Sequence, residues 1–242
     1  MAAGSEIAGV KALCFDVFGT VVDWRSSLIA EAKALGARKG IAADWERLVV
    51  AWRAGYQPAM NRVRNGELPW TPLDALHRMT LDRLLAEHEI TGLDESDKEE
   101  LNLGWHRLKG WPDSVPGLTR LKRKYIIATL SNGNVRLLTE MGKWAGLPWD
   151  TILSAEIVHR YKPDPATYRS AIEFLGMGDP GAVMMVAAHN GDLAQAQSHG
   201  MKTAFVARPA EHGPGQTRDI KPEHDFTIVA RDLEDLAAQM EA

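Results

Sequence analysis

The sequence has little cysteine, no long apolar run and no basic stripe. Its single cysteine, Cys14, cannot form a disulfide within the chain, and we expect a small buried thiol in a reducing compartment. No apolar run approaches the ~20 residues that a membrane-spanning helix needs. The formal net charge is -4 without a basic stripe, which argues against a nucleic-acid partner. Because residues 1–10 also lack the pattern of a secretory leader, we expect a cytoplasmic protein with no membrane partner.

The first half of the chain has the periodicity of helices. Between about 23 and 111 the apolar residues recur at helical spacing, as Leu28, Ala32 and Leu35 do. Pro58 interrupts one of these patterns and predicts a kink or break just before it. This part of the 242-residue chain is therefore expected to contain helices alone.

After position 112 short apolar runs alternate with helical patterns. Such alternation predicts a mostly parallel sheet with helices on both faces. The expected strands are 10–15, 125–130, 151–154, 183–187, 203–206 and 226–229. We therefore expect an α/β fold with a Rossmann-like, mostly parallel core domain of residues 1–22 and 112–242, and an inserted all-helical cap domain of residues 23–111.

Polar residues follow the expected strands, where open α/β sheets place their sites. Asp16 ends the first apolar run, and Phe18 stands two places on, where a second acid would make a pair. Ser131 and Asn132 precede a helix whose free N–H groups suit an anion. The third and fourth groups are Tyr161-Lys162-Pro163-Asp164 and Ala188-His189-Asn190-Gly191-Asp192. Each group alone could be a turn, a solvated lysine or a helix cap, but four in order favour an active site over an inert domain.

The four groups, in this order, resemble the motifs of the haloacid dehalogenase superfamily, in which the first Asp is a nucleophile. Phosphatases of that superfamily carry a second Asp where this chain has Phe18. The chain is more similar to the hydrolytic L-2-haloacid dehalogenases (type II) across nearly its whole length. This similarity includes Phe18-Gly19-Thr20, Trp52-Arg53 and Tyr161-Lys162-Pro163-Asp164 followed by Tyr168.

The resemblance implies hydrolysis of short 2-haloalkanoic acids, such as haloacetate or 2-halopropionate, to 2-hydroxy acids. Asp16 attacks the α-carbon, expels halide and forms a covalent ester, which water then hydrolyses, with inversion at the α-carbon. Burial alone would raise the pKa of Asp16, so Lys162 is expected to keep the carboxylate ionised.

The other expected roles follow the same resemblance. Arg53 and Asn132 receive the halide, Ser131 binds the substrate carboxylate, and Val17 and Phe18 border the substrate. Thr20 and Tyr168 orient the reacting groups. Asp192 positions the hydrolytic water together with either His189 or Asn190. These two alternatives stay open at the level of the sequence.

No metal or other cofactor is expected, because only Asp192 remains of the acids in the fourth motif and Lys162 can balance its charge. The expected partners are a halogenated carboxylate, water and, by analogy, a second copy of the chain in a homodimer formed through the cap. The alternatives are a metal-dependent phosphatase of the same superfamily, a hydrolase for another carbon–heteroatom bond, and a non-catalytic binding relative. Phe18 argues against the first, and the joint presence of Asp16, Ser131, Lys162 and Asp192 argues against the last.

Overall fold

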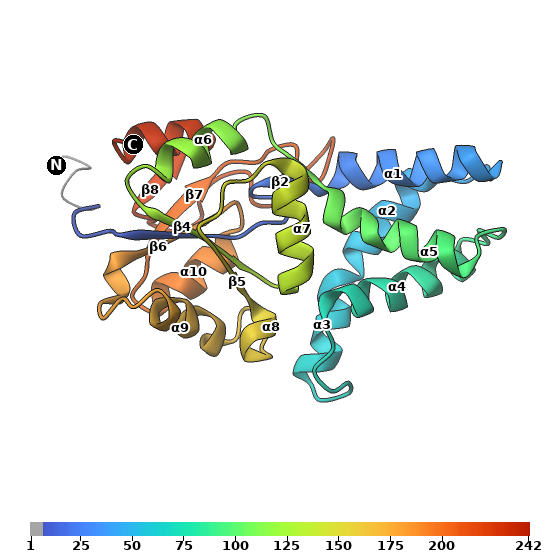
Figure 1. Ribbon diagram of the computed structural model, residues 1–242, viewed down its shortest axis with the longest axis horizontal. Coiled ribbons are helices and arrows are strands. Elements are labelled where there is room, and N and C mark those ends of the chain that lie inside the picture. The colour runs from blue at the N-terminus through green and yellow to red at the C-terminus, as the bar shows by residue number, and fades with distance from the viewer. Residues whose placement is uncertain (1–6) are drawn as a thin grey trace.

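The computed structural model describes residues 7–242 as a sheet flanked by helices, with a second group of helices beside it (Figure 1). Within these residues a six-stranded sheet has the order β5-β4-β1-β6-β7-β8, and all its neighbouring strands are parallel. The strands are β1 (Ala12–Phe15), β4 (Ile126–Ser131), β5 (Thr151–Ser154), β6 (Val183–Ala187), β7 (Lys202–Val206) and β8 (Ile228–Ala230). The predicted parallel α/β sheet is confirmed.

Helices cover both faces of the sheet because its central strands are apolar on both sides. The buried side chains of β1 alternate, so that Leu13 and Phe15 belong to one apolar cluster and Cys14 to the other. Burial raises the pKa of the Cys14 thiol to about 12, as expected for an inert thiol. The helices of this part are α6 (Ser114–Leu121), α7 (Val135–Ala145), α8 (Ala155–Val158), α9 (Pro165–Phe174), α10 (Asn190–Ser198) and α11 (Leu233–Gln239), with the 3-10 turn η3 (Pro180–Ala182).

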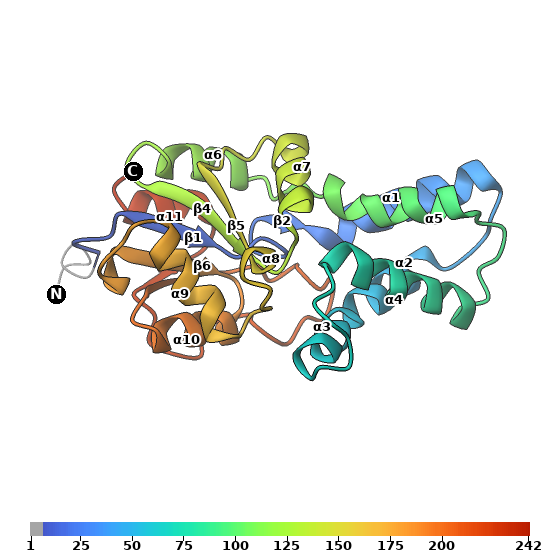
Figure 2. The same ribbon diagram turned by 60° about the horizontal axis from the view of Figure 1, so that its bottom comes forward.

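The second group of helices lies beyond the carboxyl ends of the strands (Figures 1 and 2). It consists of α1 (Trp24–Lys39), α2 (Trp45–Ala54), α3 (Tyr56–Arg64), α4 (Leu73–Glu87), α5 (Glu95–Asn102) and the 3-10 helix η2 (Leu103–Arg107). A short antiparallel ribbon of β2 (Val22–Asp23) and β3 (Lys109–Gly110) joins the group to the core. We propose that this ribbon marks the limits of the cap domain, close to the expected 23 and 111.

The strand order creates a switch point beside β1. The chain runs from β1 to β4 and then outward to β5, after which it crosses to β6 on the other side of β1. Loops at the carboxyl ends of such neighbouring strands diverge and leave space for a ligand. Asp16 follows β1 at this position, with the loop after β4 on one side and the loop after β6 on the other.

Several boundaries differ from the sequence expectations. The break before Pro58 falls at Gly55, and the last strand begins at Ile228. The ribbon of β2 and β3 was not predicted, because two-residue strands carry no periodic signal. In the described part of the chain no helix combines the length and hydropathy of a membrane span. The expectation about a secretory leader concerned residues 1–10, and residues 1–6 of these lie outside the described residues.

Candidate active site

Asp16 is the centre of a buried network of polar side chains. Its Oδ1 accepts a hydrogen bond from Lys162 Nζ at 3.0 Å. Its Oδ2 accepts one from Thr20 Oγ1 at 2.9 Å and lies 3.1 Å from His189 Nδ1. Burial of this residue, which is 8% exposed, raises the pKa of Asp16, but Lys162 and His189 outweigh that effect and hold the pKa below its usual range. The carboxylate is therefore ionised at neutral pH and has no need of a base before it attacks.

Thr20 is fixed from both sides. Its hydroxyl donates to Asp16 and accepts from the backbone N–H of Ala188 at 2.9 Å. Its backbone carbonyl accepts a hydrogen bond of 2.8 Å from Arg208 Nε, and the Arg208 guanidinium pairs through two nitrogens with Asp113, at 2.8 and 2.6 Å. This buried ion pair holds the loop that carries Asp16 and Thr20.

Lys162 lies between two carboxylates. Besides Asp16 it contacts Asp192 Oδ2 at 2.5 Å, and the Tyr168 hydroxyl donates to the other oxygen of Asp192 at 2.7 Å. Burial lowers the pKa of Lys162, but the carboxylates of Asp16 and Asp192 raise it by a larger amount. The pKa therefore lies above its usual value, and the ammonium stays charged. The backbone N–H of Lys162 donates to Asn132 Oδ1 at 2.7 Å, which joins the second motif to the third.

His189 and Asn190 are neighbours in the sequence but have different surroundings. His189 precedes α10 and directs its ring at Asp16, whereas the Asn190 amide donates to Asp219 Oδ1 at 3.0 Å and accepts from the Glu223 N–H at 2.8 Å. Asn190 thus binds the loop between β7 and β8, which follows it in the sequence by about 30 residues. The structure brings His189 to the nucleophile and leaves Asn190 out of the network around Asp16.

Glu211 is a member of this network that sequence reasoning missed. Its Oε2 lies 2.9 Å from His189 Nε2, and its Oε1 accepts a hydrogen bond of 3.1 Å from Trp24 Nε1. It comes from the long loop between β7 and β8, in which the sequence indicated no functional residue. A single acidic residue in a polar loop belongs to no motif and follows no expected strand, so the sequence does not indicate that it is functional.

Arg53 lies on the cap side of the same network. Its Nη2 is 3.9 Å from Glu211 Oε1, and its guanidinium stacks over the Tyr56 ring at 4.4 Å. Phe18 meets Tyr56 and Trp105 edge-on, with ring centroids 6.3 and 5.8 Å apart. The residue that replaces the second acid is therefore part of an aromatic contact between the core and the cap.

The start of α7 differs in part from the expectation of free N–H groups. The Val135 N–H donates to Glu156 Oε2 at 2.8 Å, and the Gly133 N–H donates to Ser131 Oγ at 3.2 Å. Two of the amides near this helix start are therefore already bonded. Ser131 is wholly buried, and the side chain of Val17 is buried beside Asp16.

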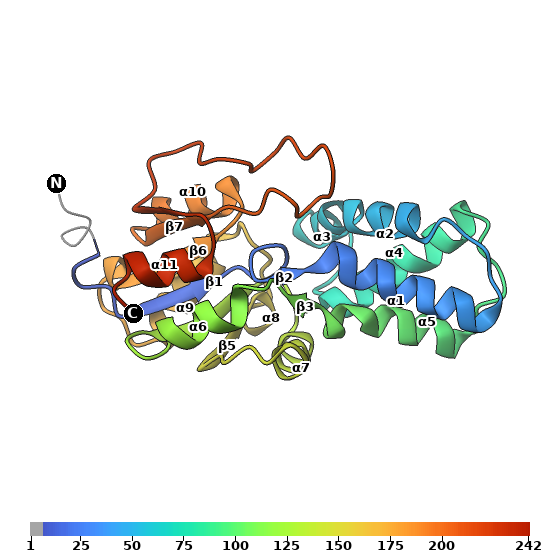
Figure 3. The ribbon, with the colours of Figure 1, turned by 90° about the horizontal axis from the view of Figure 1, so that it is seen from above.

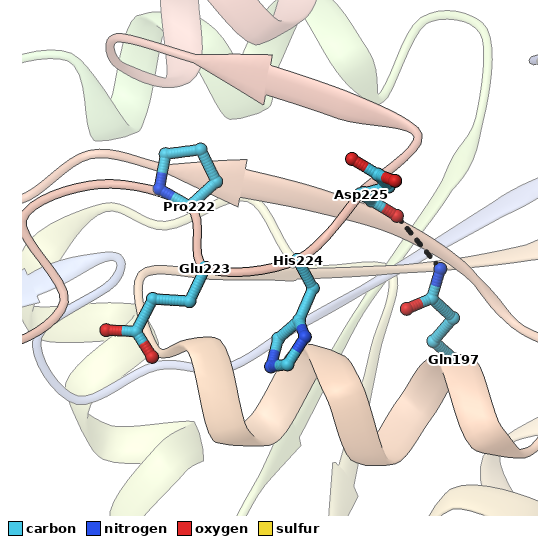
Figure 4. A pocket seen from close by; sticks show the side chains of 5 residues that line it. All are labelled: Gln197, Pro222, Glu223, His224 and Asp225. Atoms are coloured by element: carbon cyan, nitrogen blue, oxygen red, sulfur yellow. Dashed lines mark hydrogen bonds between the residues drawn. The ribbon is translucent and has the colours of Figure 1, made fainter.

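A separate hollow lies between Gln197 on α10 and the segment 222–225 (Figure 4). The Gln197 amide there donates to the Asp225 carbonyl oxygen at 3.0 Å, which fixes the far end of the loop between β7 and β8. The hollow is bounded by Gln197, Pro222, Glu223, His224 and Asp225, and no side chain that contacts Asp16 lines it. It is distinct from the network around Asp16.

The structure combines a parallel α/β core, an Asp after the first strand, a lysine between two carboxylates and a group of inserted helices. This combination defines a class of hydrolases. The family model described as haloacid dehalogenase-like hydrolase matches residues 10–200, and the chain belongs to this family. Three similar proteins are dehalogenases. The crystal structure of a defluorinating L-2-haloacid dehalogenase is 48% identical, with a TM-score of 0.93 over 96% of each chain.

The second relative, (S)-2-haloacid dehalogenase 4A of Burkholderia cepacia, is 28% identical over 96% of this chain and 94% of its own length. The third, a solved dehalogenase with an intermediate complex, is 26% identical over 94% of this chain and 96% of that chain, with a TM-score of 0.77. The resemblance inferred from the four motifs is confirmed.

Proposed function

We propose that this chain hydrolyses short L-2-haloalkanoic acids to 2-hydroxy acids through a covalent ester on Asp16. The observation that carries the proposal is the Asp16 carboxylate, which is buried and ionised beside Lys162. Phe18 occupies the position of the acid that a phosphatase uses on its leaving group. The names of the relatives, L-2-haloacid and (S)-2-haloacid dehalogenase, support the same substrate class.

In the first step Asp16 attacks the α-carbon from the side opposite the halogen. Arg53 and Asn132 receive the departing halide, and Ser131 binds the substrate carboxylate. One donor directed at developing charge is typically worth ~3–4 kcal/mol. Val17 and Phe18 border the substrate, and the aromatic contacts of Phe18 exclude water from the reacting carbon.

In the second step water attacks the carbonyl carbon of the ester. His189 Nδ1 lies 3.1 Å from Oδ2 of that carboxyl group, and Asp192 is held by Lys162 and Tyr168. Attack at the carbonyl returns the Asp16 carboxylate and leaves the product hydroxyl on the α-carbon with a single inversion. Thr20 keeps the carboxylate in one orientation during both steps.

Lys162 supplies the positive charge between Asp16 and Asp192, and we propose that the reaction needs no metal ion. We also propose a cytoplasmic location, which the single reduced Cys14 supports, and retain the homodimer as a prediction that light scattering can test.

The proposal is tested by comparing two assays of the purified protein. We expect halide release from (S)-2-chloropropionate, undiminished by a chelator, and no phosphate release from an aryl phosphate. Asp16→Asn should lower halide release by several orders of magnitude because it removes the nucleophile. Asp179→Asn, which changes an exposed acid outside the network, should leave it unchanged. Phosphate release that requires magnesium would contradict the proposal.

A further inference from the structure

Asp16, His189 and Glu211 form a continuous line of hydrogen-bonding groups. Both nitrogens of the His189 ring face carboxylates, with Nδ1 3.1 Å from Asp16 Oδ2 and Nε2 2.9 Å from Glu211 Oε2. Only the Asp16 end of this line meets the substrate carbon in the proposed function. The Glu211 end lies in the loop between β7 and β8, which Figure 3 shows reaching from the sheet towards the cap.

The Glu211 carboxylate is held rigidly. Its side chain is 0% exposed and contacts the Trp24 indole N–H, Arg53 and His212. A Cβ at Gly19, whose φ is 87°, would collide with the carboxylate, so the loop after β1 leaves room for it. Burial raises the pKa of Glu211, but His189 and Arg53 lower it to about 2, and the carboxylate is ionised.

The two carboxylates determine the charge of His189 in the resting protein. Burial lowers the pKa of His189, but Glu211 and Asp16 raise it to about 10, so that both ring nitrogens carry protons at neutral pH. A doubly protonated ring cannot accept a proton from water. His189 is therefore a partner of the Asp16 anion before the reaction starts.

Formation of the ester removes one of these two charges. An alkylated Asp16 is neutral, so the proton on Nδ1 loses its anionic acceptor, while Glu211 still holds the proton on Nε2. Lys162, which binds the other oxygen of Asp16, adds a positive charge that favours loss of the Nδ1 proton. The ring then presents a free lone pair at Nδ1, next to the ester that must be hydrolysed.

We infer that Glu211 is a positioning residue for ester hydrolysis, which fixes His189 as the Nε2–H tautomer so that Nδ1 accepts a proton from the attacking water. The inference rests on the proposed function and concerns its second step. Asp192 is less suited to this role, because its two oxygens already accept from Lys162 and Tyr168.

The protons and bonds balance through the cycle. The Nδ1 proton leaves to solvent after alkylation, and the water oxygen then bonds to the carbonyl carbon of Asp16 while Nδ1 takes one water proton. The bond between that carbon and the substrate oxygen breaks, and the departing hydroxy acid takes the second water proton. Each turnover thus releases one halide and one proton and restores the ionised Asp16 and the protonated His189.

The test measures the two steps separately in a single turnover with excess enzyme and (S)-2-chloropropionate. Rapid quenching and intact-mass spectrometry follow the ester, and halide release follows alkylation. In Glu211→Gln we expect alkylation within a few-fold of wild type and ester hydrolysis slowed by about 10²–10⁴-fold, so that the ester accumulates. Glu223→Gln, a neutralised acid exposed on the same loop, should hydrolyse the ester at the wild-type rate.

The pH profile of ester hydrolysis distinguishes positioning from simple loss of packing. Hydrolysis should rise with pH as His189 loses its proton, and in Glu211→Gln the midpoint should move down by about 1–3 pH units. A variant that is merely less well packed would lower the rate without moving the midpoint. Should Glu211→Gln fail to fold, Trp24→Phe removes a donor to the same carboxylate and should slow hydrolysis more than alkylation.

Two results would overturn the inference. In one, Glu211→Gln hydrolyses the ester as fast as wild type. In the other, Glu211→Gln slows alkylation and ester hydrolysis equally, and the midpoint of the pH profile does not move. Absence of any ester in the wild-type protein would instead overturn the proposed function, so the two failures are distinguishable.

Discussion

At Asp16 two opposing effects act on one carboxylate. Burial favours the protonated acid, whereas Lys162 at 3.0 Å and His189 at 3.1 Å favour the anion, and the anion prevails. The same cations also hold the carboxylate in place. A nucleophile that is already charged and oriented can react at a carbon without an additional base.

The charge of His189 gives a prediction about stability and pH. Its pKa is raised in the folded protein to about 10, so the folded state keeps a proton that the unfolded state loses near 6.5. The stabilisation by His189 is therefore complete below about pH 6.5 and is lost as the pH rises to about 10, with a slope of about 1.4 kcal/mol per pH unit. Denaturant unfolding between these pH values should show that slope in the difference between wild type and His189→Gln, because the other titratable groups are common to both proteins. Parallel curves for the two proteins would contradict the raised pKa.

The sequence could predict those site residues that follow strands. Asp16, Lys162 and Asp192 stand in motifs, and the structure places all three in one network. The choice between His189 and Asn190 depends on side-chain directions at the first turn of α10, which adjacent positions in a sequence cannot reveal. Glu211 depends on the path of a loop and has no local signal at all.

Among the elements, the loop between β7 and β8 has the largest effect on the site. Arg208 anchors its start to Asp113, Glu211 reaches Trp24 in the cap, and the Gln197 amide binds its end. A loop of this length carries function more often than it merely connects strands. The expected strands 203–206 and 226–229 leave this segment between them, but its contacts are long-range and depend on the complete fold.

The buried pair at the start of this loop gives a prediction about stability. Arg208→Met leaves Asp113 buried without its cation, and we expect the free energy of unfolding to fall by about 3–5 kcal/mol. Arg231→Met serves as the control, because Arg231 is 85% exposed and its pair with Asp235 should contribute about 0–1 kcal/mol. Urea unfolding of both variants measures the difference. Equal losses in the two variants would contradict the structural role of the buried pair.

At the scale of the whole molecule, the site needs both the core and the helices beside it. The core supplies the nucleophile and its lysine, and the other helices supply Arg53 and Trp24 around Glu211. His106 joins the two parts, since its ring lies 3.1 Å from Asp74 Oδ1 and 2.7 Å from Glu140 Oε2. The alternation of strands and helices predicted this architecture, whereas the contacts across it depend on side chains far apart in the sequence.

The fate of the oxygen atoms decides whether Asp16 forms a covalent ester with the substrate. A single turnover of (S)-2-chloropropionate in heavy-oxygen water, with enzyme in excess, is followed by mass spectrometry of the product and of the peptide that contains Asp16. If Asp16 forms the ester, the heavy oxygen enters the Asp16 carboxylate and the hydroxyl of the first product carries none. Heavy oxygen in the first product with an unlabelled Asp16 would show that water attacks the α-carbon directly and that no ester forms on Asp16.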